Sequence, residues 1–108
     1  MKVNLVVKED TGWKNGTLES GVTGNLWHRK LNGVIHVKFQ LSYKHNNFFD
    51  RVGRIPYYPA SEISFVARSD DRGSTNVMIS QDGSLIVSSG NGETGKNYSI
   101  SGYISFII

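Results

Sequence analysis

The chain contains no cysteine, which excludes disulfide bonds, zinc–thiolate sites and thiol nucleophiles together. Only two prolines interrupt its 108 residues, and its apolar runs are a few residues long at most. Runs this short exclude a membrane-spanning helix, and no sustained hydrophobic segment of signal-peptide type follows Met1. We therefore expect no membrane insertion, and a stability that comes from packing within one domain or across a subunit interface.

An excess of charge of one sign is also missing. Twelve Lys and Arg residues face nine Asp and Glu residues, which gives a formal net charge of +3, and the basic residues are spread along the chain. Only His28-Arg29-Lys30 forms a cluster. A nucleic-acid-binding protein usually concentrates basic side chains on one face with aromatic residues between them, so no nucleic-acid partner is expected.

Alternation of apolar and polar residues with a period of two is abundant. It is clearest from Val34 to Tyr43, where every second residue is apolar. Asn32-Gly33 and Asp82-Gly83 each separate two such runs and are typical of hairpin turns. Strands are predicted over residues 2–8, 26–31, 34–43, 63–68, 75–80, 85–88 and 98–108. The pattern predicts a single all-β domain, an antiparallel sandwich or a jelly-roll-like barrel.

The remaining segments carry weaker signals. Residues 10–25 are predicted to be irregular, with one short edge strand at most, and residues 44–61 to form a long ordered loop. Gly102 marks a bulge or a bend, and the apolar end at Ile107 and Ile108 is expected to be buried in the sheet. In an antiparallel meander the 69–74 and 89–97 loops emerge at one end, and the Asp82-Gly83 turn at the other.

The loop after the strand at residues 63–68 groups side chains that suit saccharide binding. Planar polar groups bond vicinal hydroxyls, and an aromatic ring stacks on the C–H face of a sugar. The candidates are Arg68, Asp70, Asp71, Arg72 and Asn76. The alternative interpretation is a solvated loop in which the aspartates cap turns.

Tyr98 begins the last strand, and it is either a stacking platform beside this loop or a core or interface tyrosine. Trp27 is interpreted first as a core residue and second as an aromatic ring available to a ligand. His45 adds a polar group at a strand end, and we expect a histidine on a surface loop there. His28 is assigned to the basic cluster and His36 to the polar face of its strand. None of these histidines has the spacing of a metal site, so no metal or cofactor is expected.

Catalytic motifs are missing from the sequence. There is no nucleophile elbow and no phosphate-binding loop, and Gly90-Asn91-Gly92 is only a flexible turn. Asp70 and Asp71 are adjacent, so in an extended chain their carboxylates point to opposite sides and cannot form a glycosidase pair. The chain is expected not to be an enzyme.

The order of several short motifs carries a resemblance. The motifs are Arg29-Lys30-Leu31-Asn32-Gly33-Val34, Ile55-Pro56-Tyr57-Tyr58-Pro59, Ile79-Ser80-Gln81-Asp82-Gly83, and the strand from Tyr98 to Phe106. In this order they resemble the C-terminal head domain of tail-fibre and baseplate proteins from phages of Gram-positive bacteria, above all the receptor-binding proteins of lactococcal siphophages. The resemblance covers residues 26–108.

The resemblance implies a jelly-roll-like barrel head on a homotrimer at the tip of a virion tail, where it binds saccharides of the host cell surface. It also implies that residues 1–108 are the C-terminal part of a longer protein that contacts other baseplate proteins. The family's saccharide pocket uses a tryptophan with acidic, basic and histidine side chains, but residues 55–108 contain neither tryptophan nor histidine. Candidate trimer contacts are Trp13, Phe48, Phe49 and Tyr58.

Two other functions remain open from the sequence. One is a carbohydrate-binding module of a cell-wall enzyme, and the other is a structural tail or capsid component without a ligand. A monomer would favour the first over a phage head, and a trimer that binds no glycan would favour the second.

Overall fold

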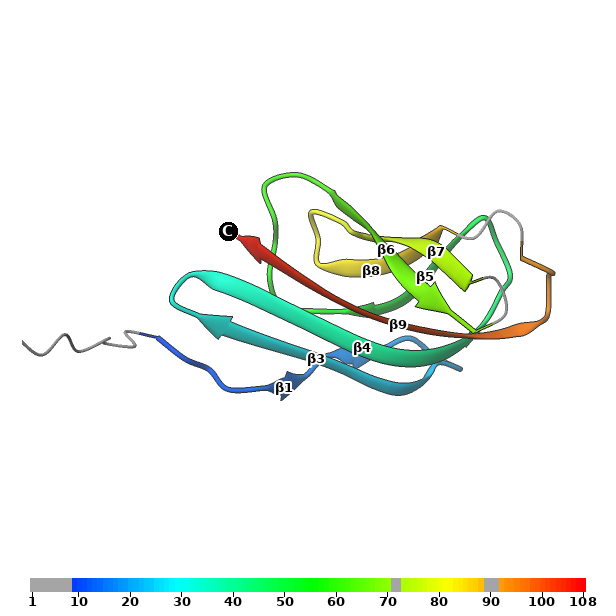
Figure 1. Cartoon of the computed structure of the whole chain (residues 1–108), viewed down its shortest axis with the longest axis horizontal. Coiled ribbons are helices and arrows are strands. Elements are labelled where there is room, and N and C mark those ends of the chain that lie inside the picture. The colour runs from blue at the N-terminus through cyan, green and yellow to red at the C-terminus, as the bar shows by residue number, and fades with distance from the viewer. Residues whose placement is uncertain (1–8, 71–72, 89–91) are drawn as a thin grey trace, which may run out of the picture.

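The Asn32-Gly33 turn joins two long antiparallel strands of the computed structural model, which describes residues 9–70, 73–88 and 92–108. Within these ranges nine strands form a nearly closed, barrel-like antiparallel sheet (Figure 1). They are β1 (Lys14–Asn15), β2 (Thr17–Leu18), β3 (Thr23–Leu31), β4 (Val34–Lys44), β5 (Phe49–Arg54), β6 (Ile63–Ser69), β7 (Gly73–Ile79), β8 (Ser84–Ser88) and β9 (Asn97–Ile107). The predicted all-β fold is therefore confirmed. No helix in the described ranges is long and apolar enough to cross a membrane.

Both predicted hairpins are present. Asn32 and Gly33 have φ angles of 48° and 81°, as a two-residue turn between β3 and β4 requires. Asp82 and Gly83 lie between β7 and β8, where the N–H of Gly83, with a φ of 84°, donates to the carbonyl of Ser80 at 3.0 Å. Because glycine has no Cβ, positive φ angles at these turns cost little.

The sheet order is β1-β3-β4-β9-β6-β7-β8-β5-β2. In Figure 1, β3 and β4 lie in one layer, β5 to β8 lie in the other, and β9 runs between them. The inward side chains of β4 are the predicted apolar ones, and all are buried: Ile35, Val37, Phe39, Leu41 and Tyr43. Alternation thus places an apolar core between the layers and a polar outer face on the sheet.

The segment from Lys14 to Leu18 nearly closes the barrel. Its first half pairs with β3 and its second half with β5, and only Gly16 separates the two. A Cβ at Gly16 would lie 2.8 Å from Leu26 Cδ2, and a Cβ at Gly53 of β5 would meet the same atom at 2.8 Å. Glycine at both positions therefore lets the backbones approach over Leu26.

The predicted long loop at residues 44–61 is wrong in part, because β5 lies within it. Asp50 and Val52 face inward, whereas Phe49 and Arg51 are exposed. At the beginning of β5 the strand therefore buries a charged side chain and exposes an aromatic one, the reverse of an ordinary half-buried strand. A register shift between Arg51 and Gly53 then breaks the two-residue period. Because of these two features, β5 does not show the alternation of apolar and polar residues by which a strand is predicted from sequence.

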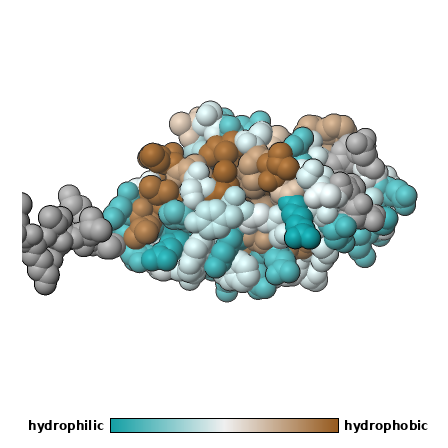
Figure 2. All heavy atoms as spheres, in the orientation of Figure 1, coloured by the Kyte–Doolittle hydropathy of each residue, from teal (hydrophilic) through white to brown (hydrophobic). Residues whose placement is uncertain are grey.

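The expected burial of Ile107 and Ile108 is also wrong. Phe106 faces the core, so Ile107 points outward and is 79% exposed. Along β9, pairing with β6 is confined to Ile100 and Ser101, and beyond these residues only β4 lies beside it. Hydrophobic spheres gather near this end of β9 in Figure 2.

Gly102 is not a bulge in the β4–β9 pairing, which runs through it without a register shift. It lies opposite Phe39, and a Cβ at Gly102 would lie 2.8 Å from the Phe39 ring. The glycine therefore makes room for a buried aromatic ring.

The N-terminal expectations have mixed outcomes. Residues 10–25 hold two strands of two residues each, β1 and β2, and the beginning of β3, which is more strand than predicted. The strand predicted over residues 2–8 lies outside the described residues.

Candidate functional site

The structure separates the predicted binding residues into two regions. The outer surface of the sheet and its rim hold Trp27, Arg68, Asp70 and Asn76. The interior near one end of the barrel holds His45 and Tyr98. Asp71 and Arg72 lie outside the described residues.

Three rows of side chains cross the outer face of β3, β4 and β9, because directly paired residues of antiparallel strands share a face. The first row is Arg29, His36 and Ser105. The second is Trp27, Lys38 and Tyr103. The third is Asn25, Gln40 and Ser101, and it continues to Arg68 of β6. Adjacent rows are two residues apart on each strand, so they lie about 7 Å from each other.

The middle row forms an aromatic cluster together with Trp13, which precedes β1. The Nζ atom of Lys38 lies 4.1 Å from the ring centroid of Trp13 and 5.1 Å from that of Trp27. The Trp13 and Tyr103 rings meet edge to face at 6.5 Å. Each cation–π contact of this kind contributes about 0.5–1 kcal/mol at an exposed site, so Lys38 holds both indoles over the sheet. We call Trp13, Trp27, Lys38 and Tyr103 the aromatic cluster.

Trp27 is therefore not a core residue. Its neighbours Leu26 and His28 are buried, and alternation turns Trp27 to the outer face, where it is half-buried against Lys38. Of the two interpretations of Trp27, the structure supports the second, an aromatic ring accessible from outside.

The segment before β1 is tied to β3, which positions Trp13. Arg29 Nε donates to Asp10 Oδ1 at 2.8 Å and Arg29 Nη2 to Asp10 Oδ2 at 2.5 Å. This ion pair, with the N–H of Gly12 donating to Asp10, holds the pKa of Asp10 below its usual value and raises that of Arg29. Thr11 adds two hydrogen bonds to the backbone of Lys30, of 3.0 and 2.9 Å.

His36 lies on the polar face of β4, as predicted, and joins the first row to the aromatic cluster. Its Nδ1 atom is 2.5 Å from the hydroxyl oxygen of Tyr103 and 2.8 Å from that of Ser105. These contacts fix the Tyr103 ring on the outer face, where it is 55% exposed.

A shallow hollow of about 320 Å³ adjoins the cluster between β4, β6 and β9. Its polar lining consists of Gln40, Arg68, Asp70, Ser99 and Ser101. The N–H of Asp70 donates to the carbonyl of Ser99, and the N–H of Ser99 donates to Asp70 Oδ1, both at 3.1 Å. Asp70, which follows β6, is thereby joined to Ser99 near the beginning of β9.

Asn76 is exposed on β7, opposite Val66, and does not line this hollow. Arg68 and Asp70 are thus brought together with residues of β4 and β9 that the sequence analysis did not select. The missed residues are Lys38, Gln40 and Tyr103, and Trp13 was selected from the sequence only as a candidate trimer contact. Alternation along β4 indicated that Lys38 and Gln40 point outward, but no signal in the sequence predicted that β4 pairs with β9.

His45 is not a surface histidine. It is 4% exposed, and its Nδ1 atom lies 2.9 Å from Oδ2 of Asp50, which is itself buried. The Tyr98 ring packs edge to face against His45 and lies beside Tyr43. Tyr98 is therefore a core tyrosine whose hydroxyl accepts the N–H of Glu93 at 2.8 Å, and its ring is not presented to solvent.

His28 is likewise buried rather than part of an exposed basic cluster. Its ring contacts Tyr57 edge to face. Burial lowers the pKa of His28, and the charge of Lys14 acts in the same direction, whereas a backbone hydrogen bond with Asn15 opposes this shift in part. Among the described residues, its Nδ1 has no hydrogen-bond partner.

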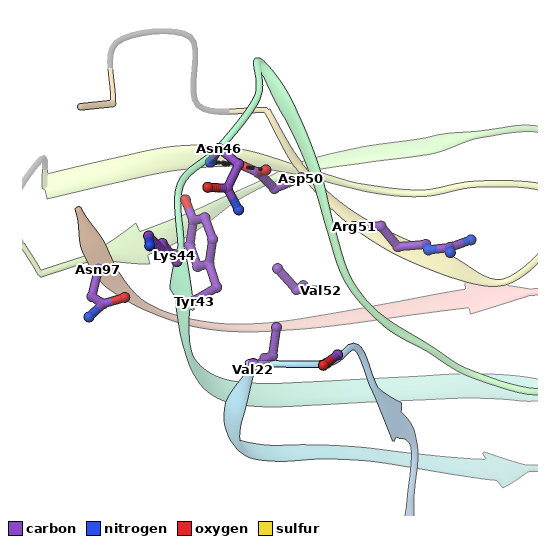
Figure 3. Close-up of a pocket in the computed structure, with 10 residues that line it drawn as sticks. Val22, Tyr43, Lys44, Asn46, Asp50, Arg51, Val52 and Asn97 are labelled. Atoms are coloured by element: carbon purple, nitrogen blue, oxygen red, sulfur yellow. Dashed lines mark hydrogen bonds between the residues drawn. The ribbon is translucent and has the colours of Figure 1, made fainter. Parts of the chain in front are cut away.

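A pocket of about 290 Å³ opens at the end of the barrel, beside the His45–Asp50 pair. Figure 3 shows Val22 and Val52 facing each other, with the Tyr43 ring beside them and Asn46 above. Lys44 and Asn97, which are paired across β4 and β9, line the same pocket. We call this the end pocket.

The comparisons with known proteins add no family: no family model matches the chain, and no curated protein is significantly similar to it. The function is therefore argued from the geometry of the outer face and from the motif resemblance. Exposed aromatic rings next to amide, hydroxyl and charged groups can bind a polar ligand that also has apolar faces.

Proposed function

We propose that this protein is a non-catalytic adhesion domain that binds host cell-surface saccharides through the outer face of β3, β4 and β9. The observation that carries the proposal is the aromatic cluster lying one row from the polar hollow. A sugar ring has an apolar C–H face and a rim of hydroxyls, so it needs both kinds of contact within one ring width.

Each part of the surface has a separate role. The Trp27 and Tyr103 rings stack on the C–H faces of successive sugars. Gln40, Arg68, Asp70 and the serines of β9 bond the hydroxyls. Because Lys38 already orders both tryptophans, little side-chain entropy is lost when a glycan binds.

We further propose that the domain acts as a homotrimeric head at the tip of a phage tail. The motif order supports this, and so do exposed aromatic residues away from the aromatic cluster: Phe48, Phe49 and Tyr58. The Phe48 and Phe49 rings meet edge to face with their centroids 4.8 Å apart, and an exposed aromatic pair is typical of an interface. Three weak sites on one head, repeated over a tail tip, bind tightly through high effective concentration.

The test is a titration of host wall polysaccharide into the wild type and into Trp27→Ala. Binding is measured by tryptophan fluorescence and by calorimetry. Loss of one stacking ring should weaken binding by about 1–2 kcal/mol, which is about tenfold or more. Val66→Ala is the matched control, because Val66 is an exposed apolar residue of β6 outside the three rows and is not a proposed trimer contact. Equal affinity of Trp27→Ala and the wild type would contradict the proposed site.

Two further results would contradict the wider proposal. Turnover of any glycan by the purified protein would contradict a non-catalytic role. A monomer in sedimentation analysis would favour a carbohydrate-binding module over a trimeric head, and a trimer that binds no host glycan would favour a structural component.

A further inference from the structure

The end pocket lies apart from the outer face and has walls of a different kind. Val22 and Val52 supply an apolar floor, and the Tyr43 ring forms one side (Figure 3). The side-chain amides of Asn46 and Asn97 are at its rim. An apolar floor with a few polar groups at the rim is the usual composition of a small-molecule site.

The single carboxylate that lines the pocket is already engaged. Asp50 accepts the N–H of Asn47 at 3.1 Å and that of Asn46 at 3.3 Å on Oδ1, and His45 lies 2.9 Å from Oδ2. A carboxylate with this many donors has little capacity left for a ligand. The Asp50 side chain therefore organises the wall of the pocket and does not attract a cation into it.

Two basic side chains and one carboxylate, that of Asp50, line the pocket. Lys44 and Arg51 both line it. Arg51 Nε bonds Glu19 Oε1 at 2.9 Å, whereas Lys44 has no carboxylate partner among the residues that the structure describes. One ammonium without a counter-ion, beside two amides, matches a ligand with one negative charge.

The volume limits the size of the ligand. Drug-sized ligands occupy pockets of about 300–1,000 Å³, and the end pocket, at about 290 Å³, lies just below this range. It has room for one sugar ring and not for an oligosaccharide.

We propose that the end pocket is a second saccharide site, which binds a single sugar ring bearing one carboxylate, such as a uronic acid at the end of a glycan chain. The ring lies over Val22 and Val52, its hydroxyls bond Asn46 and Asn97, and its carboxylate pairs with Lys44. This inference takes its ligand class from the proposed glycan-binding function. It concerns a different site, whose residues are not part of the outer-face site.

The test uses the whole chain with glucuronate as the acidic probe and glucose as its neutral match. Binding is followed by NMR on the side-chain amide signals of Asn46 and Asn97. We expect glucuronate to shift both signals and to bind about tenfold more tightly than glucose, a difference of about 1.4 kcal/mol. Raising the salt concentration from about 0.02 M to about 0.3 M should weaken glucuronate binding, because the charge of the exposed Lys44 is screened by salt.

Lys44→Gln removes the charge and keeps a polar side chain that is one atom shorter, so it should lower glucuronate affinity to the level of glucose. Lys14→Gln, a loss of one exposed positive charge on β1, is the matched control and should bind glucuronate as the wild type does. Equal binding of glucose and glucuronate, or no shift at Asn46 and Asn97, would overturn the proposal.

The outcome is separable from that of the proposed function. Polysaccharide binding at the outer face is read from the indole signals of Trp13 and Trp27, which lie outside the end pocket. Glucuronate that shifts only these indole signals would overturn the second site and leave the outer-face site standing. Shifts at Asn46 and Asn97 without any indole response to polysaccharide would support the second site and contradict the first.

Discussion

Asp50 holds the imidazole of His45 at 2.9 Å in the interior of the barrel. The same carboxylate accepts the backbone N–H groups of Asn46 and Asn47, so it closes the turn between β4 and β5. The N–H of His45 donates to the carbonyl of Lys96 at 2.9 Å, and its carbonyl accepts the N–H of Gly95 at 2.7 Å. His45 and Asp50 together thus join the β4–β5 turn to the segment that leads into β9.

Asp50→Ala should lower the free energy of unfolding by about 2–4 kcal/mol, because it removes the carboxylate that contacts the buried His45 ring and accepts two part-buried backbone N–H groups. Urea denaturation measures this. Asp70→Ala is the control: Asp70 is exposed and accepts one backbone bond, from Ser99, so its loss should cost about 1 kcal/mol or less. Similar losses for the two variants would show that burial of the His45–Asp50 pair adds nothing.

Gly53→Ala should destabilise the protein by about 1–3 kcal/mol through overpacking where the barrel closes. The new Cβ would lie 2.8 Å from Leu26 Cδ2 and 2.9 Å from the carbonyl oxygen of Thr17. Chemical denaturation of Gly53→Ala, Leu26→Ala and the double variant tests the cause. The double variant should lose less than the sum of the single losses, since removal of the Leu26 side chain relieves one contact. Strict additivity would contradict this explanation.

Asp82 gives the β7–β8 hairpin a dependence on pH. Hydrogen bonds from the hydroxyl of Ser80 and from the N–H of Ser84 to Asp82 Oδ1 lower the pKa of Asp82 from 3.8 to about 2. Because the folded pKa is depressed, the contribution to stability is complete above pH 3.8 and is lost as the pH falls through about 2.

An NMR titration of the Asp82 carboxyl carbon should give a midpoint near the folded value. Asp82→Asn should unfold more easily than the wild type at neutral pH, and the difference should disappear in strong acid. A midpoint at the ordinary value of 3.8 would contradict the hydrogen-bond network.

His28 should make the protein less stable in mild acid. Its burial lowers its pKa from the ordinary value of 6.5, so below that pH the unfolded chain binds a proton that the folded protein does not. The free energy of unfolding should therefore fall as the pH drops below 6.5, by at most about 1.4 kcal/mol per pH unit from this group. Denaturation of the wild type and of His28→Leu at several pH values should show a flatter curve for the variant, and parallel curves would contradict the assignment.

Local patterns were sufficient for most of the strands and for both hairpin turns. The alternation from Val34 to Tyr43 predicted the buried face of β4, and the two Asx-Gly pairs predicted the turns before β4 and before β8. These features depend on residues that are neighbours in the sequence. A strand with one buried face requires alternating apolar residues, and a two-residue turn with positive φ angles favours an Asx-Gly pair.

The candidate site was predicted only in part. Arg68 and Asp70 were selected, but the residues beside them on β4 and β9 were not, because the register between distant strands leaves no local signal. For a related reason, Trp27 was interpreted first as a core residue although it lies on the outer face, and His45 was expected on the surface although it is buried. Trp27 is held outside by Lys38 of the paired strand, and His45 is held inside by Asp50.

By itself the sequence determined most of the longer strands, the two hairpin turns and the apolar face of each regularly alternating strand, since all three are set by the conformational preferences of adjacent residues. Only the tertiary structure decided that Lys14–Leu18 nearly closes the barrel, that β5 buries a carboxylate, and that Trp13, Trp27 and Tyr103 meet around Lys38. Contacts between residues far apart along the chain depend on which strands pair and in which register, and that choice is made by the packing of the whole sheet.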